Sequence, residues 1–156
     1  MSPVTPKKVE QIDVPAGSLI ARFGVESDYR DCFAREVSGA VSLSEFIERF
    51  YCSAAFRPER LALGLIGRGA SNADAMRLAS GEAKSFAAWN VVERSSSEIL
   101  LRDFSGATAS WLSVQPTGEG STRLFFGSWL AKPDRPLIKA TIPIHVWYSK
   151  VLLAGA

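Results

Sequence analysis

The chain has 156 residues, of which 47% are hydrophobic and 22% are charged. This length and composition fit one globular domain with a sizeable core and exclude a largely disordered chain. The formal net charge is only +2, and no stripe of Lys and Arg with interleaved aromatic residues is present. We therefore expect no nucleic-acid partner.

The N-terminal residues lack the apolar stretch of a secretory signal. We expect a cytoplasmic protein in which residues 1–13 are a mobile tail and residues 14–156 form a single domain. Cys32 and Cys52 are too few for a disulfide framework, and small buried residues are the expected role of both.

Turns, a strand and helices are predicted in the first half of the chain. Residues 14–17 are an entry turn and residues 18–23 a short helical turn. Residues 28–37 alternate between two sets of side chains, which is typical of a strand. Ser42 and Glu45 form a capping box, so an amphipathic helix is expected to begin there.

Two shorter helices are expected next. The first covers residues 59–66, and Pro58 suits its first position. The second is capped near residues 71–74 and closes at Gly81.

Four consecutive strands are predicted over residues 86–94, 98–104, 108–115 and 122–131. Short Ser- and Gly-rich turns separate them, and apolar and polar residues alternate between the turns. Aromatic residues line this meander, among them Trp89, Trp111, Phe125 and Trp129. The meander is expected to form the body of the protein.

A last helix is predicted over residues 137–153, bent at Pro143. The stretch is too broken by polar residues and proline to span a bilayer. Its inner side carries polar side chains among apolar ones. The residues of interest are Thr141, Ile144, His145, Tyr148 and Ser149.

No metal or cofactor is expected. The single histidine, His145, and two cysteines on different elements match no metal-site spacing, and no phosphate-binding glycine loop is present. Asp31 and Asp103 fall on otherwise apolar strand faces. They would do acid–base chemistry if they converged, but pairing with a neighbouring arginine or capping of a turn is the favoured interpretation.

Three segments carry a resemblance to a known family. Residues 18–33, 103–112 and 148–153 read SLIARFGVESDYRDCF, DFSGATASWL and YSKVLL. Together they resemble an uncharacterised bacterial domain-of-unknown-function family of the START-like, or SRPBCC, superfamily, which includes the birch-pollen allergen. The resemblance implies a helix-grip fold with a cavity for a hydrophobic small molecule, and it supplies no catalytic residues.

The expected fold class is therefore α+β, a curved antiparallel sheet packed on a long C-terminal helix. The sequence departs from the superfamily pattern, because five strands are predicted where six or seven are typical and Pro143 interrupts the final helix. A cone similar to nuclear-transport-factor-like proteins is the alternative fold.

The expected function is binding of a hydrophobic or aromatic small molecule between sheet and helix. The expected ligand-binding residues are Trp89, Trp111, Phe125, Trp129, Thr141, Ile144, His145, Tyr148 and Ser149. One alternative is a cyclase, dehydratase or hydrolase that uses His145. The other is a structural or interaction domain whose cavity is filled by its own side chains.

Overall fold

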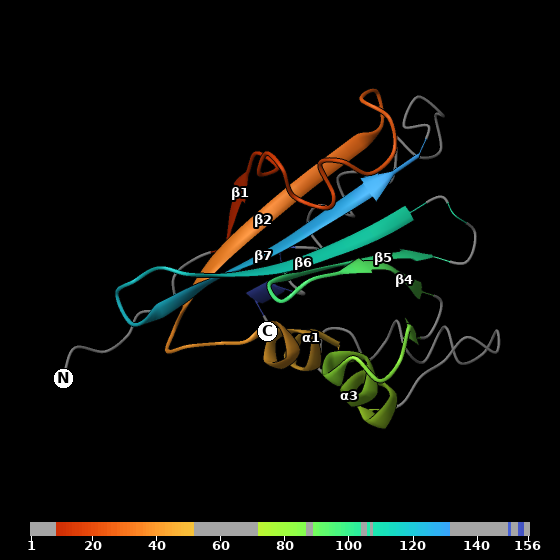
Figure 1. Ribbon diagram of the computed structural model, residues 1–156. Coiled ribbons are helices and arrows are strands. Elements are labelled where there is room, and N and C mark those ends of the chain that lie inside the picture. The colour runs from red at the N-terminus through yellow and green to blue at the C-terminus, as the bar shows by residue number, and fades with distance from the viewer. Residues whose placement is uncertain are drawn as a thin grey trace.

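A seven-stranded antiparallel sheet organises the computed structural model, which describes residues 9–51, 72–86, 89–103, 106, 108–131, 150 and 153–154. The strands follow one another in the order β1-β2-β7-β6-β5-β4-β3 (Figure 1). Their bounds are β1 Glu10–Ile12, β2 Tyr29–Ser38, β3 Ser85–Phe86, β4 Trp89–Arg94, β5 Glu98–Asp103, β6 Thr108–Pro116 and β7 Ser121–Leu130.

The predicted meander is present as β4 to β7, with each strand paired to the next. One prediction is corrected in detail, because β3 ends at Phe86 and β4 begins at Trp89, where a single strand over residues 86–94 was predicted. The register of β4 against β5 also shifts between Val91 and Glu93, as in a β-bulge.

The predicted strand at residues 28–37 is β2. It pairs antiparallel with β7 over ten residue pairs, from Tyr29↔Leu130 to Ser38↔Ser121. On its other side β2 pairs with β1. The three residues of β1 fall inside the segment predicted to be a mobile tail. Their ladder hydrogen bonds to β2 give them an ordered place at the edge of the sheet.

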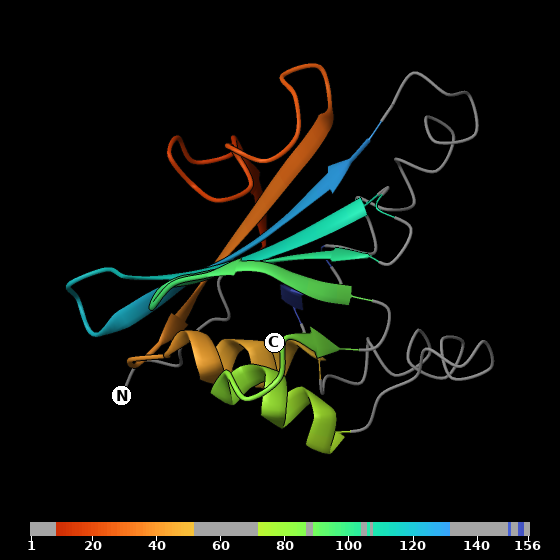
Figure 2. The same ribbon diagram turned by 45° about the vertical axis from the view of Figure 1, so that its right-hand side comes forward.

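Helices α1 (Leu43–Tyr51) and α3 (Asn72–Ser80) cover one face of the sheet, as Figures 1 and 2 show. The predicted capping box is present, since the Glu45 amide donates to Oγ of Ser42 at 3.1 Å. The apolar side of α1 packs on alternate residues of the strands. Buried members of this cluster include Phe33, Phe46, Ile47, Phe50, Leu101, Leu112, Leu124 and Phe126.

The predicted helix-grip fold is wrong. In the described residues, the helical cover of the sheet comes from α1 and α3, which lie between β2 and β3, and no long C-terminal helix packs on the sheet. Of the predicted final helix only Lys150 and Leu153 lie among the described residues. Leu153 is buried in the same cluster as α1, and its carbonyl accepts a hydrogen bond from Arg35 at 3.3 Å.

The helix predicted over residues 59–66 lies outside the described residues, whereas the next predicted helix is α3. It ends as expected near Gly81, whose positive φ of 87° favours glycine and whose amide donates to the Leu78 carbonyl at 3.1 Å. In the part of the chain that the structure describes, no helix is long and apolar enough to cross a bilayer.

The opposite face of the sheet is covered by the segment that joins β1 to β2 (Figure 2). Residues 14–23 of this segment pack on the strands without forming a regular helix. The strand residues buried beneath it are Cys32, Ala34, Leu100, Ala109, Trp111, Phe125 and Trp129. One face of the sheet is therefore covered by helices, and the other by a segment without regular secondary structure.

Candidate functional site

Arg30 holds the segment between β1 and β2 in place. Its guanidinium donates to four main-chain carbonyls, and a planar fork with five N–H donors is suited to this. The acceptors are Ile20 at 3.1 Å, Phe23, Val25 at 3.0 Å and Asp28 at 3.2 Å. A single side chain of β2 therefore fixes the path of residues 20–28 over the sheet.

Glu98, at the start of β5, is a second anchor. Its Oε1 accepts a hydrogen bond of 2.7 Å from the main-chain amide of Leu19. Nearby, the Ser18 hydroxyl donates to the Pro15 carbonyl at 2.7 Å and accepts from the Ala21 amide at 3.2 Å. These bonds shape the turn that leads from residue 15 onto the sheet.

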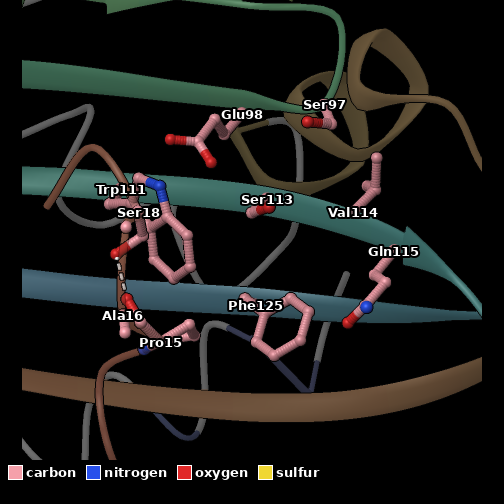
Figure 3. A pocket seen from close by; sticks show the side chains of 11 residues that line it. Pro15, Ala16, Ser18, Ser97, Glu98, Trp111, Ser113, Val114, Gln115 and Phe125 are labelled. Atoms are coloured by element: carbon pink, nitrogen blue, oxygen red, sulfur yellow. Dashed lines mark hydrogen bonds between the residues drawn. The ribbon is translucent and has the colours of Figure 1, made fainter. Parts of the chain in front are cut away.

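A cavity of about 280 Å³ lies between this turn and strands β5, β6 and β7 (Figure 3). The segment supplies one wall of the cavity and the strands supply its base. The lining residues are Pro15, Ala16, Gly17, Ser18, Ser97, Glu98, Trp111, Ser113, Val114, Gln115 and Phe125.

Two aromatic rings, Trp111 and Phe125, belong to the apolar part of the lining. Their centroids are 6.0 Å apart with 43° between the ring planes. Trp111 faces Gly127 across the strand pair, and a side chain at that position would meet the indole ring at 3.0 Å. The glycine therefore leaves the room in which the indole lies over β7.

The polar part of the lining comes from the same strands. Ser113 pairs across the sheet with both Glu98 and Phe125, so these three residues lie in one row. In Figure 3 they lie between Trp111 at one end and Gln115 at the other. A ligand in this cavity would meet aromatic carbon on the base and hydrogen-bonding groups along the row.

The cavity lining contains a carboxylate and a buried N–H group that lacks a described hydrogen-bond partner. Among the lining residues that the structure describes, Glu98 is the sole ionisable side chain. Trp111 is 1% exposed, and its indole Nε1 has no hydrogen-bond partner within the described part of the chain. A buried N–H without an acceptor is unusual in a folded protein.

The structure brings together only part of the predicted site. Trp111 and Phe125 line the cavity. Trp129 lies on the same face but beneath Phe23, with ring centroids 4.7 Å apart, and its Nε1 donates to Asp28 at 3.0 Å. Trp89 packs with the cluster on the opposite face. Thr141, Ile144, His145, Tyr148 and Ser149 lie outside the described residues, so the predictions about them stay predictions.

Sequence reasoning missed Glu98, Ser113 and the turn at residues 15–18. A signal was present in the strands, because Glu98 shares a strand face with Leu100, and Ser113 shares one with Trp111. No local pattern indicated that residues 15–18 would lie against that row.

The two aspartates predicted on apolar strand faces do not converge. Asp31 lies on β2 and Asp103 on β5, with β7 and β6 between them. Three strand spacings of about 4.8 Å put their strands about 14 Å apart. The expectation that each aspartate pairs with an arginine or caps a turn is confirmed for Asp103. Its carboxylate caps a turn by accepting the Thr108 amide at 3.3 Å.

Asp31 is a buried hydrogen-bond acceptor. It is 4% exposed and accepts from the Tyr29 hydroxyl at 2.9 Å and from the Ser128 amide at 3.1 Å. Burial, together with the neighbouring Asp31, raises the pKa of the Tyr29 phenol well above its usual range.

In the described ranges, no three His, Cys, Asp or Glu side chains gather in a way that would hold a metal ion. No known family model matches the chain, and no match was found among the curated proteins or the solved structures. The resemblance to the START-like superfamily therefore stays a prediction.

Proposed function

We propose that this protein binds a small organic molecule in the cavity between the turn at residues 15–18 and strands β5 to β7. The observation that carries the proposal is the cavity itself, about 280 Å³ in volume, with Trp111 and Phe125 on its base. That volume lies near the lower end of the range of roughly 300–1,000 Å³ typical of small-molecule sites.

The lining combines polar and apolar groups. Small-molecule sites combine apolar and aromatic surface with a few polar groups that fix orientation. Here the aromatic surface comes from β6 and β7, and the polar groups are the Glu98 carboxylate, the Ser113 hydroxyl and the Gln115 amide. The segment that forms the outer wall is held by Arg30 and Glu98, so the cavity exists before a ligand arrives.

Nuclear magnetic resonance titration of the full chain with a library of fragment-sized compounds tests this function. We expect a subset of compounds to shift the amide signals of Ser113 and Gln115 and the indole N–H signal of Trp111. The indole signal is assigned by its absence from the spectrum of a Trp111→Phe variant. Compounds that shift only signals from the opposite face, or a library without any hit, would contradict the proposal.

A cavity-filling substitution sharpens the test. Ser113→Leu places a larger apolar side chain in the cavity and is expected to abolish the shifts. Ser96→Leu adds the same side chain at an exposed turn outside the cavity and is expected to leave them unchanged. Equal binding by both variants would place the ligand elsewhere.

A further inference from the structure

We infer that the molecule bound in this cavity is a small organic cation, an amine or a guanidine attached to an apolar or aromatic body. The inference rests on the proposed function and adds the chemical class of the ligand. It follows from the charge of the lining, the position of that charge beside two rings, and the acceptor oxygen of Glu98 that has no partner among the described residues.

The charge of the lining is negative. Glu98 contributes a carboxylate, and no Lys, Arg or His is among the described residues that line the cavity. An anionic ligand would meet this carboxylate without a compensating cation, whereas a cation would form a charge-assisted hydrogen bond with it.

The carboxylate is held in place but has capacity left. The Leu19 amide occupies Oε1, and the second oxygen has no partner among the residues described. Because an ionised carboxylate accepts several hydrogen bonds, Oε2 is available to a donor in the cavity. The bond from Leu19 keeps the side chain from turning away, so the acceptor is oriented in advance.

The aromatic rings beside the Glu98 carboxylate also favour a cationic ligand. Positive groups are attracted to the faces of aromatic rings, and the effect grows where water is excluded. The chain already uses this contact on Phe125, since the Arg123 guanidinium lies 5.3 Å from its ring centroid while remaining outside the cavity lining. An ammonium or guanidinium held by Glu98 would lie beside these two rings, which are 1% and 5% exposed.

Three probes of similar shape separate charge from size, namely benzylamine, benzyl alcohol and benzoate. Each is titrated into the full chain, and the dissociation constant is taken from the Ser113 and Gln115 amide shifts. We expect benzylamine to bind at least about tenfold more tightly than benzyl alcohol, and benzoate to bind more weakly than either.

The decisive variant is Glu98→Gln, because an amide oxygen can still accept from the Leu19 amide while the charge is lost. We expect this variant to bind benzylamine and benzyl alcohol equally. Glu119→Gln removes one carboxylate from an exposed turn outside the cavity and is expected to keep the tenfold preference.

The outcomes distinguish the two levels of the proposal. Equal binding of all three probes to the unmodified protein, within the cavity, would overturn the cation inference and leave the binding function standing. A preference for benzylamine that survives Glu98→Gln would also overturn it. Absence of cavity shifts with every probe would overturn both the cation inference and the binding function at this site.

Discussion

The indole N–H of Trp129 donates to Oδ2 of Asp28 at 3.0 Å, and Gly24 lies against both residues. The same carboxylate oxygen accepts the Val25 amide at 2.9 Å. The outer segment is thereby joined to the sheet by a ring on β7. The junction has no room for a side chain at position 24, and this gives the first prediction.

Gly24→Ala is expected to destabilise the protein more than Gly17→Ala. Both glycines have a positive φ, 73° and 80°, so both substitutions carry the backbone cost of roughly 1–2 kcal/mol. Only at position 24 would the new Cβ overlap Trp129 and Asp28, whereas nothing lies within 4 Å at position 17. Breaking a hydrogen bond to a carboxylate adds about 1.5–3 kcal/mol.

Urea unfolding followed by circular dichroism measures the difference between the two glycine variants. Equal losses would show that the Trp129–Asp28 contact adds nothing to stability.

A second prediction compares two tryptophans on one sheet face. Trp129→Phe removes a hydrogen bond to a carboxylate, whereas Trp111→Phe removes a buried N–H that has no partner in the described part of the chain. Both variants lose a similar volume. Because an unsatisfied buried donor costs about 1–3 kcal/mol, we expect Trp111→Phe to be the less destabilising variant by a margin of that order.

Free energies of unfolding from urea titration give this comparison, with circular dichroism as the signal because both substitutions alter fluorescence. If Trp111→Phe proved the more costly, the indole N–H would have an acceptor in solution.

The third prediction concerns Arg94, which joins β4 to the helices. Its guanidinium donates at 2.6 Å to the carbonyls of Leu78 and of Ala79, near the C-terminus of α3, and at 3.3 Å to Ser44 of α1. A cation at this end of a helix satisfies carbonyls that have no partner within the helix. Arg94→Met is therefore expected to lower the unfolding free energy by about 2–3 kcal/mol.

Arg49→Met is the matched control. Arg49 is half exposed and pairs with Glu45 at 3.8 Å, and such a surface pair contributes less than about 1 kcal/mol. Thermal or urea unfolding of both variants decides the point, and similar losses would refute the role assigned to Arg94.

The fourth prediction is a loss of stability at alkaline pH. Burial, with a smaller contribution from Asp31, raises the pKa of the Cys32 thiol from 9.0 to about 12, and the pKa of Tyr29 is raised from 10.0 by the same causes. Above pH 9 the unfolded chain therefore releases protons that the folded chain retains. The two groups make their full contribution to the unfolding free energy below pH 9. That contribution falls as the pH rises toward 12.

The slope of unfolding free energy against pH between 9 and 11 measures this effect. Cys32→Ala and Tyr29→Phe remove the two groups, so each variant is expected to show a shallower fall than the unmodified protein. Parallel curves for all three proteins would mean that neither group has a raised pKa in the folded state.

Local pattern was enough to place most of the described elements. Alternation located β2 and β5 to β7 within one or two residues, and the Ser42 capping box located the start of α1. Hydrogen bonding and amphipathicity within a short window determine these features.

The arrangement of the elements in space was not predictable in the same way. Which layer covers which face depends on contacts between distant segments, such as Leu19 with Glu98 and Asp28 with Trp129. An amphipathic pattern at residues 137–153 indicates an apolar side but not what that side packs against. The predicted cavity lay between the sheet and the final helix, and the observed one shares only Trp111 and Phe125 with the predicted lining, because its outer wall comes from a turn with no apolar periodicity.

The pairing of β2 with β7 has a consequence for how the chain reaches its fold. Strands β4 to β7 are neighbours in sequence and can pair through short turns. Strand β2 pairs with β7, which is synthesised much later than β2. During synthesis, the apolar residues of β2 therefore stay without their central neighbour until residue 130 has left the ribosome. Joining β2 to the finished meander is the non-local step, and it is expected to set the folding rate in the range of milliseconds to seconds.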